Sequence, residues 1–402
     1  MTSVRRWRCG SLLSLMLSAM VLVAIPGARA GPAPDLGRRV GSELSAVAVA
    51  PGGDVVVVGT VDERFGRSML LARFGPSGVR EWARRWHPRT AENGWGYAWA
   101  EDVAVAPDGS IYVAGAVNVT HIEGDAWFVR KYGPNGGLRW QRAEPGWRTE
   151  PLAARATTVA TGPGGLMVVG IDHHGCCGIA DDDGWVRAYG PRGDVRWTRQ
   201  FEAPSISGTH DRVRDVAISA LGRVYVAGSV DMWLEGDTAT WVGQTVLVQK
   251  LAPGGSLIWS RFLRDGQRAD VDQVTAIAAH GDRLVLTGLV NRRHNHAGKA
   301  FLARWSFGGN VVWTRSWREN SEDPWDVAVA RDGRTYVVGS DRQERGFLRS
   351  FKRGGRLAWE ALLDRARGGV SFSGVTIGRS IWVVGTVYTN MQERGVLWRF
   401  SA

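Results

Sequence analysis

The chain lacks the features on which several protein classes depend. It has 3 cysteines in 402 residues, too few for a scaffold built on disulfides. It contains no G-x-S-x-G nucleophile elbow, no H-E-x-x-H zinc motif and no phosphate-binding loop. The formal net charge is +11, but the basic residues are scattered singly, whereas nucleic-acid binding needs a clustered basic face. The sequence therefore favours neither these enzyme classes nor a nucleic-acid partner.

Long apolar runs are also missing, except near the start of the chain. That run extends from Leu12 to Ile25, follows the basic pair Arg5 and Arg6, and precedes an A-x-A pattern that ends at Ala30. These are the three parts of a secretory signal peptide, and the run is too short to span a membrane comfortably. We therefore expect a signal peptide over residues 1–30, cleaved near Ala30.

The expected location follows from this segment. The mature chain, residues 31–402, is predicted to be secreted, periplasmic or attached to the cell surface, with no integral membrane segment. The arginine pair is compatible with twin-arginine export as well as with the general secretory route, and the sequence leaves both open.

Seven copies of one pattern fill the mature chain. Each copy reads as an apolar strand A, a tight turn, a strand B closed by glycine, a variable connection, an aromatic strand C, a Gly-rich turn and a strand D with tryptophan. The clearest copy runs from Asp102 to Trp140. The closing glycines recur at intervals of about 46 to 60 residues. They are Gly59, Gly115, Gly170, Gly228, Gly288, Gly339 and Gly385.

A fixed period with four strands per copy is typical of a β-propeller. We predict an all-β, seven-bladed β-propeller of four-stranded antiparallel blades, forming a single domain over residues 31–402. The last copy has no strand D before Ala402. We expect the segment from Asp35 to Val40 to supply this strand, complete the last blade and close the ring.

The spacing between strands C and D is constant. In six copies an aromatic residue or leucine in strand C is followed eight residues later by tryptophan in strand D. We interpret these tryptophans as scaffold that packs between blades, since large aromatic side chains dominate core burial. The pairs are Phe74/Trp82, Tyr132/Trp140, Tyr189/Trp197, Leu251/Trp259, Trp305/Trp313 and Phe351/Trp359.

Two repeat families resemble these copies. The stretches DVAVAPDGSIYVAG and KYGPNGGLRW resemble the bacterial seven-bladed propeller repeats of the SBBP type, which occur in secreted and surface proteins. The ending from Gly137 to Trp140 is similar to PQQ-type quinoprotein repeats. The first resemblance implies a secreted propeller, and the second implies that a quinone cofactor, PQQ, is an alternative to consider.

In a propeller the B–C and D–A connections emerge on one face. Here these connections are long and irregular, which usually marks the binding face of a repeat array. The most unusual one contains Cys176 and Cys177, beside His173 and His174. The two cysteines form a vicinal disulfide, act with the histidines as metal ligands, or stay inert thiols, and these alternatives remain open.

Polar and aromatic residues of the same connections are the candidate binding residues. Some tryptophans fall outside the constant spacing, Trp147, Trp241 and Trp325 among them. Such aromatic side chains suit stacking on sugar rings or a protein contact, although packing onto the blades is the other interpretation. The candidates are Trp95, Trp99, His121, Asp125, Asp172, His173, His174, His210, Asp211, Trp233, His294 and His296.

The leading functional prediction is a binding or scaffold module for a glycan or protein partner on this face, with no catalytic residue assigned and no cofactor predicted. The alternative is an enzyme, an oxidoreductase, lyase or hydrolase, with a metal or PQQ over the central channel. Its ligands or acid–base groups would be the histidines of the connections, since histidine titrates near neutral pH. A structural role in a surface layer is a third possibility.

Overall fold

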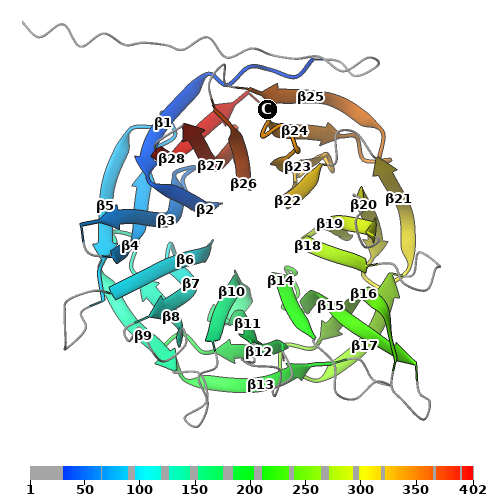
Figure 1. Cartoon of the computed structure of the whole chain (residues 1–402). Coiled ribbons are helices and arrows are strands. Elements are labelled where there is room, and N and C mark those ends of the chain that lie inside the picture. The colour runs from blue at the N-terminus through cyan, green and yellow to red at the C-terminus, as the bar shows by residue number, and fades with distance from the viewer. Residues whose placement is uncertain are drawn as a thin grey trace, which may run out of the picture.

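The strands of the computed structural model form a ring around a central axis (Figure 1). No helix in the described part of the chain is long and apolar enough to cross a membrane. The structure describes residues 30–64, 66–88, 96–118, 126–144, 153–174, 184–202, 211–234, 240–263, 271–292, 298–317, 322–364, 368–389 and 392–401. The predicted signal peptide lies outside these residues, apart from Ala30.

Four strands, A to D in the order of the repeat, form each antiparallel unit. Strand A lies nearest the axis and strand D lies outermost (Figure 1). Units one and two form one eight-stranded sheet. Their strands are β2 (Glu43–Val49), β3 (Val55–Glu63), β4 (Gly66–Phe74), β5 (Arg80–Trp86), β6 (Gly96–Val105), β7 (Ile111–Asn118), β8 (Ala126–Tyr132) and β9 (Leu138–Glu144).

Units four and five form the second eight-stranded sheet, and unit three is a separate four-stranded sheet. The strands of units four and five are β14 (Arg212–Ile218), β15 (Val224–Leu234), β16 (Thr240–Leu251), β17 (Leu257–Leu263), β18 (Val271–His280), β19 (Arg283–Arg292), β20 (Lys299–Ser306) and β21 (Val311–Trp317). Those of unit three are β10 (Ala153–Thr161), β11 (Met167–His174), β12 (Gly184–Tyr189) and β13 (Val195–Phe201), with the short 3-10 helix η1 (Pro163–Gly165) between the first two.

Units six and seven are the remaining four-stranded sheets. Unit six contains β22 (Asp323–Val329), β23 (Thr335–Ser340), β24 (Gly346–Phe351) and β25 (Leu357–Leu363). Unit seven contains β26 (Val370–Ile377), β27 (Ile381–Thr389), β28 (Gln392–Phe400) and, from the other end of the chain, β1 (Leu36–Gly41).

The prediction of seven separate blades is wrong as a description of the sheets. Hydrogen bonding joins the strands into five sheets, three with four strands and two with eight. The joins come from two C strands, β4 with 9 residues and β16 with 12, each of which pairs in parallel over one or two residues with strand A of the next unit. The bridges join Gly66 to Gly96, Arg67 to Tyr97 and Gln244 to Val271. The predicted all-β propeller of four-stranded antiparallel units is retained.

The predicted closure of the ring is confirmed. Strand β1 pairs antiparallel with β28 and takes the outer position of unit seven (Figure 1). Asp35 adds an ion pair to Arg399, with Arg399 Nε 3.0 Å from Asp35 Oδ1. Just before this strand, the backbone N–H of Gly31 donates to the carbonyl of Glu360 on β25. The N-terminal segment therefore connects unit seven to unit six.

A β-bulge explains the glycine that closes each strand B. In every unit the register of strands A and B shifts by one residue near the start of strand A. The backbones approach so closely there that a Cβ at Gly115 would lie 1.9 Å from the carbonyl oxygen of Trp99, and one at Gly339 would lie 2.2 Å from that of Asp323. Only glycine fits, which accounts for its recurrence.

The tryptophans of strand D pack between units, as the constant spacing predicted. Trp140 covers Gly193 in the C–D turn of the next unit, whose φ is 80°, and a Cβ at that glycine would lie 3.0 Å from the indole. The indole N–H of Trp140 also donates to the carbonyl of Pro191 in this turn (3.1 Å). Trp197 donates in the same way to Pro253 (2.9 Å).

Three half-buried aspartates link the A strands of neighbouring units. They occupy one repeat position directly after the bulge, in units two, four and six. Each carboxylate accepts a hydrogen bond from its own chain neighbour and another from a backbone N–H of the next unit. The inter-unit bonds join Asp102 to Val159 (2.7 Å), Asp215 to Ile277 (2.8 Å) and Asp326 to Val375 (2.7 Å).

Candidate binding site

A hollow of about 220 Å³ lies between units six and seven. Its walls come from the end of β23, the turn between β23 and β24, the start of β26 and the end of β27. All of these lie where the B–C and D–A connections emerge, which is the face predicted to bind. The lining residues are Ser340, Asp341, Glu344, Val370, Ser371 and Tyr388.

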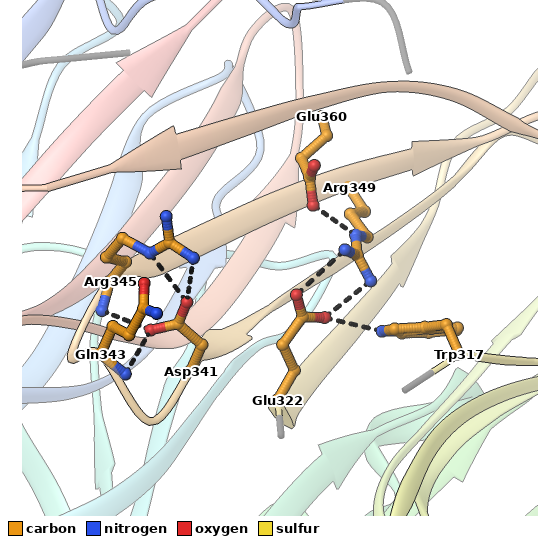
Figure 2. Close-up of polar contacts among 7 residues, drawn as sticks. All are labelled: Trp317, Glu322, Asp341, Gln343, Arg345, Arg349 and Glu360. Carbon is orange, nitrogen blue, oxygen red and sulfur yellow. Dashed lines mark hydrogen bonds and ion pairs between the residues drawn. The ribbon is translucent and has the colours of Figure 1, made fainter. Parts of the chain in front are cut away.

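Asp341 fixes the turn that forms one wall of the hollow (Figure 2). Its Oδ1 accepts backbone hydrogen bonds from Gln343 and Arg345, each 2.9 Å long. Its Oδ2 pairs with Nε and Nη2 of Arg345, at 2.8 and 2.7 Å. Because both carboxylate oxygens are engaged, Asp341 acts as a structural anchor of the turn.

Glu344 is the residue that this turn presents to the hollow. Its φ is 57°, the only positive φ of a non-glycine residue in the described part of the chain, and this conformation costs of order 1 kcal/mol. Its carbonyl accepts the N–H of Val370 (2.6 Å), and its side chain covers Gly369, where a Cβ would lie 2.5 Å from Oε2. The exposed carboxylate is therefore held on a tightly constrained backbone.

Trp325 stands beside the hollow because it is the bulged residue of β22. A bulge re-aims its side chain, and here 48% of the tryptophan is exposed. Its indole N–H donates to Ser340 Oγ (3.2 Å), which lies 3.4 Å from Ser371 Oγ. A polar strip of two hydroxyls thus joins the aromatic ring to the lining of the hollow.

Tyr388 supplies the second aromatic group. It is 37% exposed, and Trp325 and Tyr388 are the only exposed aromatic side chains among the residues described. Partial burial raises the pKa of Tyr388, and the charges of Glu43, Glu393 and Glu344 raise it further. The phenol therefore stays protonated near neutral pH, where it can donate or accept a hydrogen bond but is a poor base.

A buried ion network lies next to this turn in unit six (Figure 2). Arg349 on β24 makes a bidentate pair with Glu322, at 2.6 and 3.0 Å, and donates from Nε to Glu360 on β25 (2.5 Å). Trp317 of unit five donates to Glu322 (2.7 Å) and stacks on the guanidinium, 5.1 Å from the ring centroid. The charged side chains are at most 3% exposed, so the network supports β24 and does not face a ligand.

Unit two has an arginine at the position equivalent to Arg349, but it lacks the carboxylates that pair with Arg349. Arg130 on β8 stacks on Trp86 at 4.0 Å, as Arg349 does on Trp317. The residue opposite it on β9 is Gln141, where Arg349 has Glu360. In the described part of the chain, Nε and Nη1 of Arg130 are buried without an acceptor, and burial lowers the pKa of this arginine.

We predict that Gln141→Glu stabilises the protein by about 1 kcal/mol, because it supplies Arg130 with a charged acceptor. Urea unfolding of both proteins measures this difference. In an Arg130→Met background the same substitution should lose its benefit. A gain that persists without Arg130 would contradict the pairing.

Most of the predicted site residues lie outside the described residues. These are Trp95, His121, Asp125, Cys176, Cys177, His210, His294 and His296. His173 and His174 lie on β11 and Trp233 on β15, opposite Trp241, but only their backbone is described. The choice between a disulfide, a metal site and inert thiols therefore stays a prediction.

The remaining predicted residues do not gather at the hollow. Trp99 on β6 is half-buried and stacks with Tyr97, with ring centroids 6.0 Å apart. Asp172 is buried and accepts the backbone N–H of Val213 in the next unit (2.8 Å), and Asp211 is buried just before β14. Strands β11 and β14 lie across the ring from β26, and unit one separates β6 from unit seven (Figure 1).

No group of three histidine, cysteine, aspartate or glutamate side chains suited to a metal ion occurs among the described residues. The side chains of the histidines in the enzyme hypothesis are not among those described, so the metal and PQQ alternatives stay predictions. Sequence reasoning singled out Trp325 as an aromatic outside the constant spacing, but it missed Tyr388, Glu344 and the two serines.

Comparison with known proteins supports the fold. No family model and no curated protein matches the chain. Among solved structures it is similar to polysaccharide lyase Uly1 (12% identity, TM-score 0.52), with 94% of each chain covered. It is also similar to an ulvan lyase of family PL25 bound to -[GlcA(1-4)Rha3S]- (9% identity, TM-score 0.54), with 95% of this chain and 96% of that chain covered.

A third similar structure is Drosophila Plexin A in complex with Semaphorin 1b. It has 9% identity and a TM-score of 0.54, with 92% of this chain and 88% of that chain covered. Identities this low indicate a shared fold and do not transfer a function. The resemblances to SBBP-type and PQQ-type repeats accordingly stay predictions.

Proposed function

We propose that this chain binds a glycan in the hollow between units six and seven. One observation carries the proposal. The two aromatic side chains that are exposed among the described residues, Trp325 and Tyr388, both flank a hollow lined by hydroxyl and carboxylate groups. Sugar rings offer an apolar face and a rim of hydroxyls, so an aromatic surface beside hydrogen-bonding groups matches their chemistry.

The similar structures agree with this choice. Two of the three are polysaccharide lyases, one of them bound to a saccharide. Plexin A binds a protein, and a protein partner is the other outcome that the experiment below distinguishes.

Binding fits the described residues better than a reaction does. Asp341 is committed to Arg345, and the pKa of Tyr388 is raised, so neither is a ready base near neutral pH. Glu344 is then the one lining carboxylate without a hydrogen bond or ion pair in the described part of the chain, whereas glycosidases usually need two carboxyl groups.

Trp325→Ala tests the proposal. Screening on an array of neutral, acidic and amino oligosaccharides identifies a ligand, and calorimetry measures its affinity. We expect the substitution to weaken binding about tenfold, which corresponds to about 1.4 kcal/mol. Leu221→Ala is the matched control, since Leu221 is 79% exposed in an A–B turn on the opposite face. Absence of any glycan ligand, or equal loss in both variants, would contradict the proposal.

A further inference from the structure

We infer that the glycan carries a positive charge, as in a hexosamine with free amino groups; this inference rests on the proposed function. Glu344 is the first reason. Its exposed carboxylate lines the hollow and makes no hydrogen bond or ion pair in the described part of the chain. A ligand ammonium group would supply the missing partner, through a charge-assisted hydrogen bond.

Two further carboxylates add negative charge near Tyr388, which lines the hollow. Glu393 lies opposite Tyr388 on β28, and Glu43 begins β2 in unit one. Both act electrostatically on the phenol of Tyr388, together with Glu344, and among the described residues no arginine offsets them there. The charges that the described residues bring to this hydroxyl are therefore negative, which attracts cations and disfavours anions.

The described arginines near these strand ends are engaged or face elsewhere. Arg345 is paired with Asp341, and Arg67 pairs with Asp62 (3.1 Å) and Glu43 (3.9 Å). Arg394 donates to the side chain of Gln392. Arg342 is exposed on the turn and does not line the hollow. No arginine among the described residues is thus presented to a ligand carboxylate or sulfate in the hollow.

The aromatic groups favour the same ligand. A cation over the face of tryptophan is attracted by the ring quadrupole, so the exposed ring of Trp325 would hold both the sugar face and its ammonium group. The volume of about 220 Å³ is below the usual range for drug-sized ligands, which suits one sugar residue of a longer chain.

The test compares two probes that differ only in the amine. Chitosan oligosaccharide has free amino groups, and the N-acetylated oligomer of the same length does not. We expect the free-amine probe to bind at least tenfold more tightly at pH 6, with a preference that falls as salt is raised. Glu344→Gln should reduce its affinity about tenfold and leave the N-acetylated probe unchanged. Asp332→Asn, in an A–B turn on the opposite face, should change neither.

The outcomes separate the two proposals. Equal binding of both probes, or tighter binding of an acidic oligosaccharide, would overturn the charge assignment while keeping glycan binding. Binding of polylysine through Glu344 with no saccharide bound would overturn both and favour a basic protein partner. If no oligosaccharide binds the wild-type protein, the proposed function itself fails.

Discussion

Arg349→Met should lower the free energy of unfolding by about 3 to 5 kcal/mol, the cost of breaking a buried ion pair by removing one partner. The substitution leaves Glu322 and Glu360 buried without their cation. It also removes the guanidinium from the face of Trp317, which belongs to unit five. The loss should therefore loosen the contact between units five and six, and it is measured by urea unfolding at neutral pH.

Two further variants show whether the carboxylates cause this loss. Arg84→Met removes an arginine that also stacks on a tryptophan, 5.3 Å from the centroid of Trp82, but is exposed. We expect it to cost at most about 0.5 kcal/mol. Adding Glu322→Gln and Glu360→Gln to Arg349→Met should recover part of the stability. If the triple variant is no more stable than Arg349→Met, buried charge is not the reason for the loss.

Stability should fall by about 3 kcal/mol or more as pH rises from 5 to 8. Burial raises the pKa of Asp102 from 3.8 to about 6, of Asp326 to about 7 and of Asp215 to about 8, and the charge of Asp102 adds to the rise for Asp215. The folded protein then retains protons that the unfolded chain releases near pH 4. The stabilisation is complete below that pH and is lost as pH rises to the folded pKa of each group, and for Asp326 alone the rise from pH 5 to 7 removes about 3 kcal/mol.

The geometry supports a shared proton. Thr158 Oγ lies 2.7 Å from Asp215 Oδ1 and 3.2 Å from Asp102 Oδ2. One hydroxyl has a single proton to donate, so both contacts are favourable only if one carboxyl is protonated and donates to the threonine. Backbone N–H donors favour ionisation and oppose this, but burial is the larger effect.

Urea unfolding across this pH range measures the effect. The double variant Asp102→Asn with Asp215→Asn should show a much flatter pH dependence than the wild type, although the amides also change the absolute stability. The histidines are common to both proteins, so any contribution from them cancels in the comparison. A wild type that is equally stable or more stable at pH 8 would contradict the assignment.

Much of the fold was predictable because the residues that recur in each copy are those that the local backbone geometry requires. The glycine closing strand B, such as Gly339, marks a backbone approach that excludes a Cβ, and the spacing from strand C to Trp140 and its equivalents fixes the hairpin length. The division into five sheets was not predictable. It depends on one or two bridging residues in each of β4 and β16, which pair with strand A of the neighbouring unit.

The candidate site was predictable only in part. The sequence indicated the face on which the hollow lies and singled out Trp325, but it favoured the long connections, whereas Glu344 lies on a short turn. Tyr388 has no distinguishing signal, because its exposure depends on how unit seven meets unit six. The aspartates at 102, 215 and 326 recur at one repeat position, and this recurrence was a signal of an inter-unit role.

The most direct measurement of the central claim is a crystal structure of the protein with its strongest oligosaccharide ligand. We expect a sugar ring on the face of Trp325, with its polar rim toward Ser340, Ser371 and Tyr388 and an amino group at Glu344. A ligand bound elsewhere on the ring, with the hollow between units six and seven left free, would contradict it.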